Sequence, residues 1–251
     1  MQDRYSGDVG DFGKYILLNQ LYANSKEKIT IGFNWYKVTQ EEKNNDGKYT
    51  NYLSPSNRQY HHYYRCSPEI HTKLKSIVDS DNRCLEAIEN NNVLPPNTLF
   101  YSNEIPLCEN YVNRKSKRKH WFDQSLSSLN EADVVYVDPD NGIQTKSVKK
   151  THKDSIKYVF KDEIQKYYLE GKSVIIYNHR NMAPEEVYLN KFRELANLFS
   201  EEADLRVLKF SRYSVRDYVF LIQQKHKHII NKTIDQLIQK PFNFMFNERD
   251  L

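Results

Sequence analysis

Residues 134–142 read VVYVDPDNG, and this stretch decides how the chain folds. A run of β-branched and aromatic residues that stops at Asp138-Pro139 predicts a buried strand. Buried strands of this kind are typical of open α/β sheets, which bind their ligands beyond the carboxyl ends of the strands. The residues that follow the run, Asp138, Asp140 and Asn141, are therefore candidate catalytic residues. The alternative is a simple turn, because Pro, Asp, Asn and Gly all favour turns.

Strand and helix patterns alternate on both sides of this run. We expect further strands at 28–38, 97–105, 172–180, 204–210 and 217–223. We expect helices at 13–26, 111–129, 159–170, 184–199 and 226–239, and two more within 67–90. This order predicts an α/β fold with a doubly wound, mainly parallel sheet and an antiparallel final strand pair. Residues 1–251 read as one domain, with a small insertion at about 39–95 that begins as an irregular, tyrosine-rich loop.

Composition restricts the class of protein. The 251 residues carry 37 Lys and Arg against 33 Asp and Glu, and a net charge of +4 permits a nucleic-acid partner without requiring one. The three cysteines, at 66, 84 and 108, have neither the spacing of a zinc site nor the even number of a disulfide framework. No run of about 18 apolar residues exists. We expect a cytoplasmic protein with no membrane partner.

A second candidate segment, YSGDVGDFGK, spans residues 5–14. Asp8 and Asp11 alternate with glycines, so the backbone could wrap a ligand while Lys14 reaches a phosphate or carboxylate. The alternative is a helix entry in which Asp11 is the N-cap.

The expected strand at 172–180 ends in YNHRN, residues 177–181. Its end brings His179 and Arg180 to the same edge of the sheet as Asp138. A histidine and an arginine beside carboxylates could serve as a base and a phosphate clamp, although a histidine at a strand end is often only hydrogen-bonded. Around the last hairpin, Arg212, Arg216 and Asp217 predict a partly exposed ion pair or the rim of a substrate site.

The sequence RKSKRKHW at 114–121 is the strongest basic run. Its cations would attract a phosphate backbone, and a solvated helix face is the alternative. The candidate substrate-binding residues of this run are Arg114, Lys115, Lys117, Arg118 and Lys119.

Two of these segments resemble a known family. Asp138-Pro139-Asp140-Asn141 is similar to the Asp/Asn-Pro-Pro-aromatic motif of class I S-adenosylmethionine-dependent methyltransferases that act on exocyclic amino groups of nucleic-acid bases. RYSGDVGDFGKYILL, residues 4–18, resembles the N-terminal signature of the RlmJ-type ribosomal RNA adenine-N6 methyltransferases.

The resemblance implies a Rossmann-like methyltransferase fold that binds S-adenosylmethionine and a nucleic-acid base or nucleotide. Asp138 and the Pro139 carbonyl would accept hydrogen bonds from the target amino group. The implied cofactor-binding residues are Asp8, Asp11, Lys14, Trp35, Tyr36 and Glu104. Trp35 and Tyr36 stand where the family has a glycine-rich turn, and Asn141 replaces its aromatic residue.

Two other functions remain open from the sequence. In a metal-dependent nuclease or hydrolase, Asp138 and Asp140 would hold Mg²⁺, with Glu104 or Asp46 as a third ligand. In a catalytically inactive nucleic-acid-binding module, only the fold and the basic helix would matter.

Overall fold

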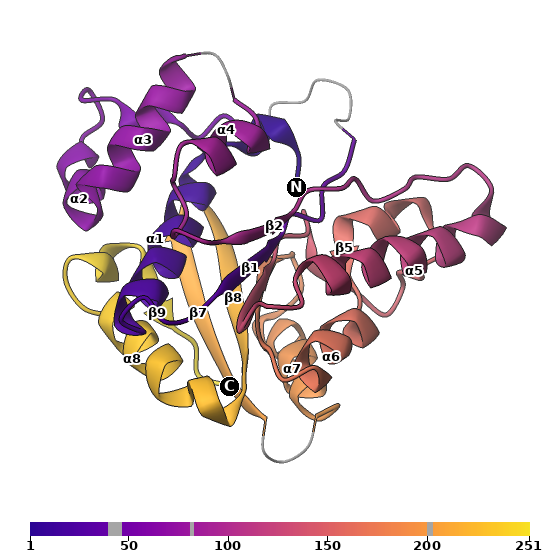
Figure 1. Ribbon diagram of the computed structural model, residues 1–251. Helices are drawn as coiled ribbons and strands as arrows, with labels where there is room; N and C mark the ends of the chain where they lie inside the picture. The colour runs from indigo at the N-terminus through magenta and orange to yellow at the C-terminus, as the bar shows by residue number, and fades with distance from the viewer. Residues whose placement is uncertain (40–46, 81–82, 200–202) are drawn as a thin grey trace.

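The computed structural model describes residues 1–39, 47–80, 83–199 and 203–251. Within them lies a seven-stranded sheet with the order β2-β1-β3-β6-β8-β7-β9 (Figure 1). In chain order its strands are β1 (Ile31–Asn34), β2 (Leu99–Tyr101), β3 (Val134–Val137), β6 (Ser173–His179), β7 (Asp204–Arg212), β8 (Ser214–Ile222) and β9 (Phe246–Glu248). The opening run VVYV is thus a central strand, with all four residues buried.

The sheet is mixed. β2, β1, β3 and β6 are parallel to their neighbours, whereas β8 is antiparallel to both β6 and β7, and β9 is antiparallel to β7. The α/β class is confirmed, but the expectation of a mainly parallel sheet was too strong. The antiparallel pair β7-β8 does not end the sheet, because β9, near the C-terminus, pairs outside β7.

Helices cover both faces of the sheet. On one face lie α1 (Val9–Asn24) and α8 (Lys227–Leu237), and on the other lie α5 (Tyr111–Ser128), α6 (Lys161–Leu169) and α7 (Glu185–Ala196) (Figure 1). Side chains alternate between the faces of a strand, so Tyr136 packs in the core of the α1 face and Val137 in the core of the α5 face. The next residue, Asp138, therefore points to the α1 face.

The described part of residues 47–95 carries three α-helices: α2 (Tyr60–Cys66), α3 (Pro68–Asp79) and α4 (Leu85–Asn90). Tyr63 and Leu74 belong to the same buried cluster as Phe12 of α1. The expected irregular loop is therefore wrong in part, because α2 forms where the sequence is tyrosine- and histidine-rich. This helix is stabilised by tertiary packing of aromatic rings, such as Tyr63 on Tyr52 with centroids 5.3 Å apart.

Helix α1 begins earlier than expected. Its N-cap is Asp8, not Asp11, and Asp8 Oδ1 accepts hydrogen bonds from the N–H groups of Gly10 and Asp11 at 2.6 and 3.2 Å. Asp11 consequently lies in the first turn of the helix, and Lys14 follows one turn later on the same side.

The DPDNG segment continues into a small second sheet, in which β4 (Gly142–Ile143) pairs with β5 (Tyr158–Val159). Gly142 has φ +97°, and a Cβ there would lie 2.3 Å from Asn178 Oδ1. A glycine is therefore required for the chain to leave β3 and pass over β6. None of the helices in the described residues is long and apolar enough to span a membrane.

Candidate functional site

A cavity of about 390 Å³ lies beyond the ends of β3 and β6, beside the first turns of α1. We call it the Asp138 cavity. It is lined by residues from six chain segments that are distant in sequence: Met1, Gln2, Tyr5, Asp8, Gly10, Asp11, Lys14, Gly47, Tyr49, Asp138, Pro139, Asp140, Asn141, Lys157, Tyr177, His179, Ser214 and Arg216. All four candidate catalytic residues, and Asp8, Asp11 and Lys14 of the cofactor set, are among them.

Strand register explains why these side chains meet. Asp138 follows Tyr136 by two residues and shares its face of the sheet. His179 follows Tyr177 by two residues on β6 and is paired directly with Arg216 on β8. Residues directly opposite each other in an antiparallel pair point to the same side. Asp138, His179 and Arg216 therefore all face α1.

Lys14 joins two acids at the base of the cavity. Its Nζ lies 2.6 Å from Asp138 Oδ2 and 2.9 Å from Asp11 Oδ1, and each of the three residues is 2 % exposed. Burial alone would lower the pKa of Lys14, but the two carboxylates raise it well above its usual value, so the lysine stays charged. Burial raises the pKa of Asp138, and Lys14 opposes this shift.

Asp140 has different partners. Its Oδ1 lies 2.8 Å from the Met1 amino nitrogen, and its Oδ2 accepts from Gln2 Nε2 at 3.0 Å. Burial would raise the pKa of Asp140, but the amino group and these contacts hold it below its usual range. The Met1 amino group also donates to the backbone oxygens of Tyr36 and Asp138, at 2.8 and 3.3 Å.

Asp11 should make stability depend on pH. Burial, opposed by Lys14, raises its pKa from 3.8 to about 6. Between pH 4 and 6 the folded chain then holds a proton on Asp11 that the unfolded chain releases, so stability falls as the pH rises through this window. We expect the difference in unfolding free energy between the wild type and Asp11→Asn to fall by about 2 kcal/mol from pH 4 to 7.

Urea titrations of both proteins at each pH measure this difference, in which the contributions of carboxylates distant from Asp11 largely cancel. A difference that stays constant across the window would contradict the raised pKa.

Three expected cofactor residues lie outside the cavity. The Trp35 ring packs on Phe33, with centroids 4.0 Å apart, and its Nε1 donates to Glu89 at 2.6 Å. Tyr36 is fully buried and its hydroxyl donates to Glu163 at 3.2 Å. Glu104 accepts from Thr39 and lines a separate open groove beside α5. The structure therefore does not bring these three side chains to Asp138.

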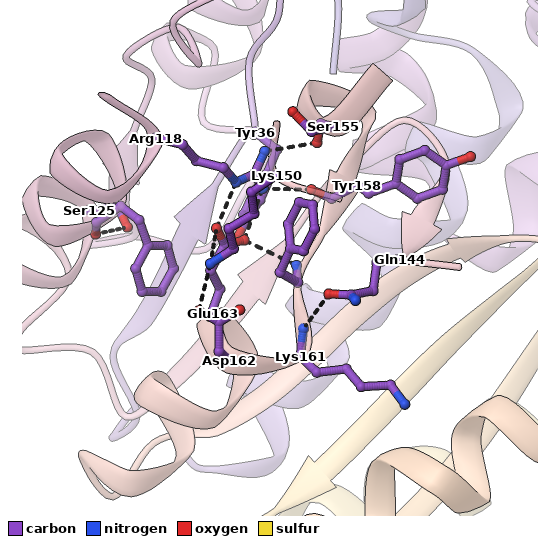
Figure 2. Close-up of polar contacts among 12 residues, drawn as sticks. Tyr36, Arg118, Ser125, Gln144, Lys150, Ser155, Tyr158, Lys161, Asp162 and Glu163 are labelled. Atoms are coloured by element: carbon purple, nitrogen blue, oxygen red, sulfur yellow. Dashed lines mark hydrogen bonds and ion pairs between the residues drawn. The ribbon is translucent and has the colours of Figure 1, made fainter. Parts of the chain in front are cut away.

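The basic run does not form one continuous charged surface. Arg118 is 2 % exposed and binds Glu163 together with the backbone oxygens of Ser155 and Tyr158 (Figure 2). Arg114 is also buried and donates to the backbone oxygens of Cys108, Glu109 and Thr151. The period of a helix explains this, because residues four apart share a face.

The three lysines of the run, Lys115, Lys117 and Lys119, are exposed, and Lys119 pairs with Asp123 at 2.6 Å. Arg180, the remaining substrate-binding candidate, is not among the residues that line the Asp138 cavity. It donates to the backbone oxygen of Ala183 at 2.7 Å and lies over the Tyr188 ring.

Arg216 was expected only as part of an exposed ion pair or a rim, and not among the catalytic, cofactor-binding or substrate-binding candidates. The expectation of a partly exposed ion pair among Arg212, Arg216 and Asp217 is wrong, because Arg216 and Asp217 are 3 % and 0 % exposed. The alternative, the rim of a substrate site, stays a prediction, and Arg216 lines the Asp138 cavity. Asp217 faces away from the Asp138 cavity and pairs with Arg249 at 2.7 Å. Strand alternation was the available signal: Arg216 precedes the buried Tyr218 by two residues.

The described residues contain no group of three or more His, Cys, Asp or Glu side chains that could hold a metal ion. Asp138 and Asp140 are paired with cations of the chain itself, and Glu104 is at another groove. Asp46, the other proposed ligand, lies outside the described residues.

Comparison of the chain with protein families, curated proteins and solved structures finds little similarity. No family model matches the chain, and no curated protein matches it. Among solved structures, a similar one is LPL1258 from Legionella pneumophila str. Philadelphia 1, described by the family model DUF519. The two chains are 11 % identical, with 97 % of each covered and a TM-score of 0.47.

Proposed function

We propose that this chain is a methyltransferase-like enzyme that acts on an amino group of a nucleic-acid base or nucleotide bound in the Asp138 cavity. The strand order supports this scaffold: a parallel set ends in an antiparallel β6-β8-β7 arrangement, and Asp138-Pro139 follows a central strand. The same pattern carries the resemblance to class I methyltransferases in the sequence.

The observation that carries the proposal is the position of Asp138. It is buried at a cavity wall, and Lys14 favours its ionised form. A carboxylate accepts hydrogen bonds but cannot donate them, so it selects a donor such as an amino group. An amino nitrogen that accepts a methyl group gains positive charge while the donor keeps the electron pair of the broken bond, and the nitrogen then loses a proton. Asp138 and the Pro139 carbonyl would stabilise the positive charge.

Aromatic side chains at the cavity support a base as the substrate. Tyr5 and Tyr49 line it, and the Tyr49 ring lies 5.0 Å from that of Tyr213, which is 50 % exposed. Exposed tyrosine rings bind nucleic-acid bases by stacking, whatever the base sequence.

The place that class I enzymes use for S-adenosylmethionine does not fit that cofactor in this chain. Trp35 and Tyr36 close the end of β1 with buried side chains, and the Met1 amino group bridges the backbone oxygens of Tyr36 and Asp138. No glycine-rich turn lets a ligand approach the backbone there. The proposal therefore concerns recognition and activation of the amino group, and the methyl donor needs its own test.

We expect the cavity to distinguish bases by their amino groups. Adenosine or cytidine should bind at least about tenfold more tightly than inosine or uridine, because the latter place an acceptor against the Asp138 carboxylate. Asp138→Asn should remove this preference, since its amide can donate as well as accept. Isothermal titration of the four nucleosides measures it.

Asp123→Asn, at an exposed site away from the cavity, is the matched control and should behave as the wild type. Equal affinity for adenosine and inosine would refute amino-group recognition. In the same instrument, heat on titration with S-adenosylmethionine would support methyl transfer, whereas no heat at millimolar cofactor would remove it.

A further inference from the structure

Arg216 differs from the other deeply buried arginines in what its guanidinium binds. Arg114 and Arg118 each use their guanidinium nitrogens on carbonyl or carboxylate oxygens. Arg216 is 3 % exposed, and its Nη2 donates to Ser214 Oγ at 2.7 Å. Its Nε and Nη1 have no hydrogen-bond partner in the described part of the chain.

No carboxylate among residues 1–39, 47–80, 83–199 and 203–251 forms an ion pair with Arg216 within 4.0 Å. Asp8, whose charge acts on the guanidinium, uses Oδ1 to cap α1. Burial alone would lower the pKa of Arg216, but the neighbouring Tyr177 hydroxyl and the Asp8 carboxylate raise it, so the side chain keeps its charge. A buried cation with two unused donors is costly to the free protein, and an oxyanion ligand would satisfy it.

The surroundings of the guanidinium hold it in the wall of the Asp138 cavity. A Cβ on Gly10 would lie 2.6 Å from Nη1, so a glycine at this turn of α1 lets the guanidinium lie against the helix. The rings of Phe210 and Tyr177 lie 5.6 and 5.9 Å from Cζ. His179, paired opposite Arg216, lines the same cavity.

We propose that Arg216 is the anion-binding residue of the Asp138 cavity and binds a phosphate monoester of a nucleotide whose base amino group meets Asp138. This assignment rests on the proposed function. β3 and β8 are separated by β6, and two strand spacings amount to about 10 Å. An extended mononucleotide spans such a separation between its base and its phosphate, so the two groups of one substrate can reach both residues.

The test compares the wild type with Arg216→Met, which keeps the bulk of the side chain and removes its donors. The control is Arg206→Met on β7, because Arg206 pairs with Glu248 and Asp235 outside the cavity. Inorganic phosphate, AMP and adenosine are the probes, at constant ionic strength. Melting temperatures and titration calorimetry are the two measurements.

In the wild type, phosphate should raise the melting temperature, and AMP should bind at least about tenfold more tightly than adenosine. In Arg216→Met, phosphate should have no effect and AMP should bind no better than adenosine. Without ligand, Arg216→Met should melt close to the wild-type temperature, because the variant loses only the Nη2 hydrogen bond to Ser214 and removes a buried charge that is costly to the free protein. Arg216→Lys should still bind AMP somewhat more tightly than adenosine, because it keeps the positive charge.

A wild type that binds AMP and adenosine equally, or an Arg216→Met variant that keeps the preference, would overturn the assignment. If adenosine binds in an Asp138-dependent way but phosphate adds nothing, this assignment fails and the proposed function stands. If phosphate binds through Arg216 while no nucleoside binds, the proposed function fails and the anion site stands. A 5′-phosphorylated oligonucleotide that binds as tightly as AMP would assign the phosphate to a nucleic-acid end, and weaker binding would assign it to a free mononucleotide.

Discussion

Replacing Lys14 with Met should lower the free energy of unfolding by about 3–5 kcal/mol. The substitution keeps the length of the side chain but leaves Asp11 and Asp138 buried, close together and without their shared cation. One or both acids must then take up a proton at neutral pH or draw water into the cavity. Urea unfolding at pH 7, followed by circular dichroism, measures the loss.

Lys119→Met is the matched control for Lys14→Met. Lys119 also pairs with an aspartate at 2.6 Å, but it is on the surface, where such a pair contributes about 0–1 kcal/mol. Adding Asp138→Asn to Lys14→Met should restore part of the lost unfolding free energy, because the two substitutions remove the two partners of the same ion pair. If Lys14→Met lowers the free energy of unfolding no more than Lys119→Met does, the buried Asp11 and Asp138 do not depend on Lys14.

The central part of the fold follows from local patterns. The run at 134–137 is apolar on both faces, as a strand buried in the centre of a sheet must be. The helix expected at 111–129 agrees with α5 to within one residue at each end. Elements that depend on distant partners were missed. Strand β9 forms because the segment around Phe246 pairs with β7. Helix α2 forms because its buried side chains pack in the same cluster as those of α1. Neither has a distinctive period or cap in the sequence.

The site shows the same division. Asp138, Asp11 and His179 could be placed together because each stands at the end of a predicted element. The sequence does not show which cations are used inside the protein. Lys14, Arg118 and Arg216 are all basic residues, yet Lys14 pairs with two acids of the cavity and Arg118 pairs with Glu163. Arg216 has two donors without a hydrogen-bond partner among the residues that the structure describes. The acids that decide their roles are distant in sequence, because Asp138 lies 124 residues from Lys14 and Glu163 lies 45 residues from Arg118.

Arg118→Met should also cost about 3–5 kcal/mol of unfolding free energy. Arg118 donates from Nε and Nη2 to both carboxylate oxygens of Glu163, at 2.7 and 2.9 Å, and from Nη1 to the Ser155 oxygen at 2.8 Å (Figure 2). The variant leaves Glu163, which is 1 % exposed, without this partner. Thermal and urea unfolding measure the loss, and Lys117→Met, one residue away on the exposed side of α5, should stay within about 0.5 kcal/mol of the wild type.

Arg118→Lys should restore little of the unfolding free energy that Arg118→Met loses. An ammonium group cannot bind both oxygens of Glu163 and two backbone oxygens in the geometry of a guanidinium. The segment that Arg118 holds also carries Lys157, a residue of the Asp138 cavity wall, so Arg118→Met should weaken nucleotide binding without touching the ligand. An Arg118→Met protein as stable as Lys117→Met would contradict the prediction that the Arg118–Glu163 pair stabilises the fold. The basic run would then regain its place as a candidate nucleic-acid surface.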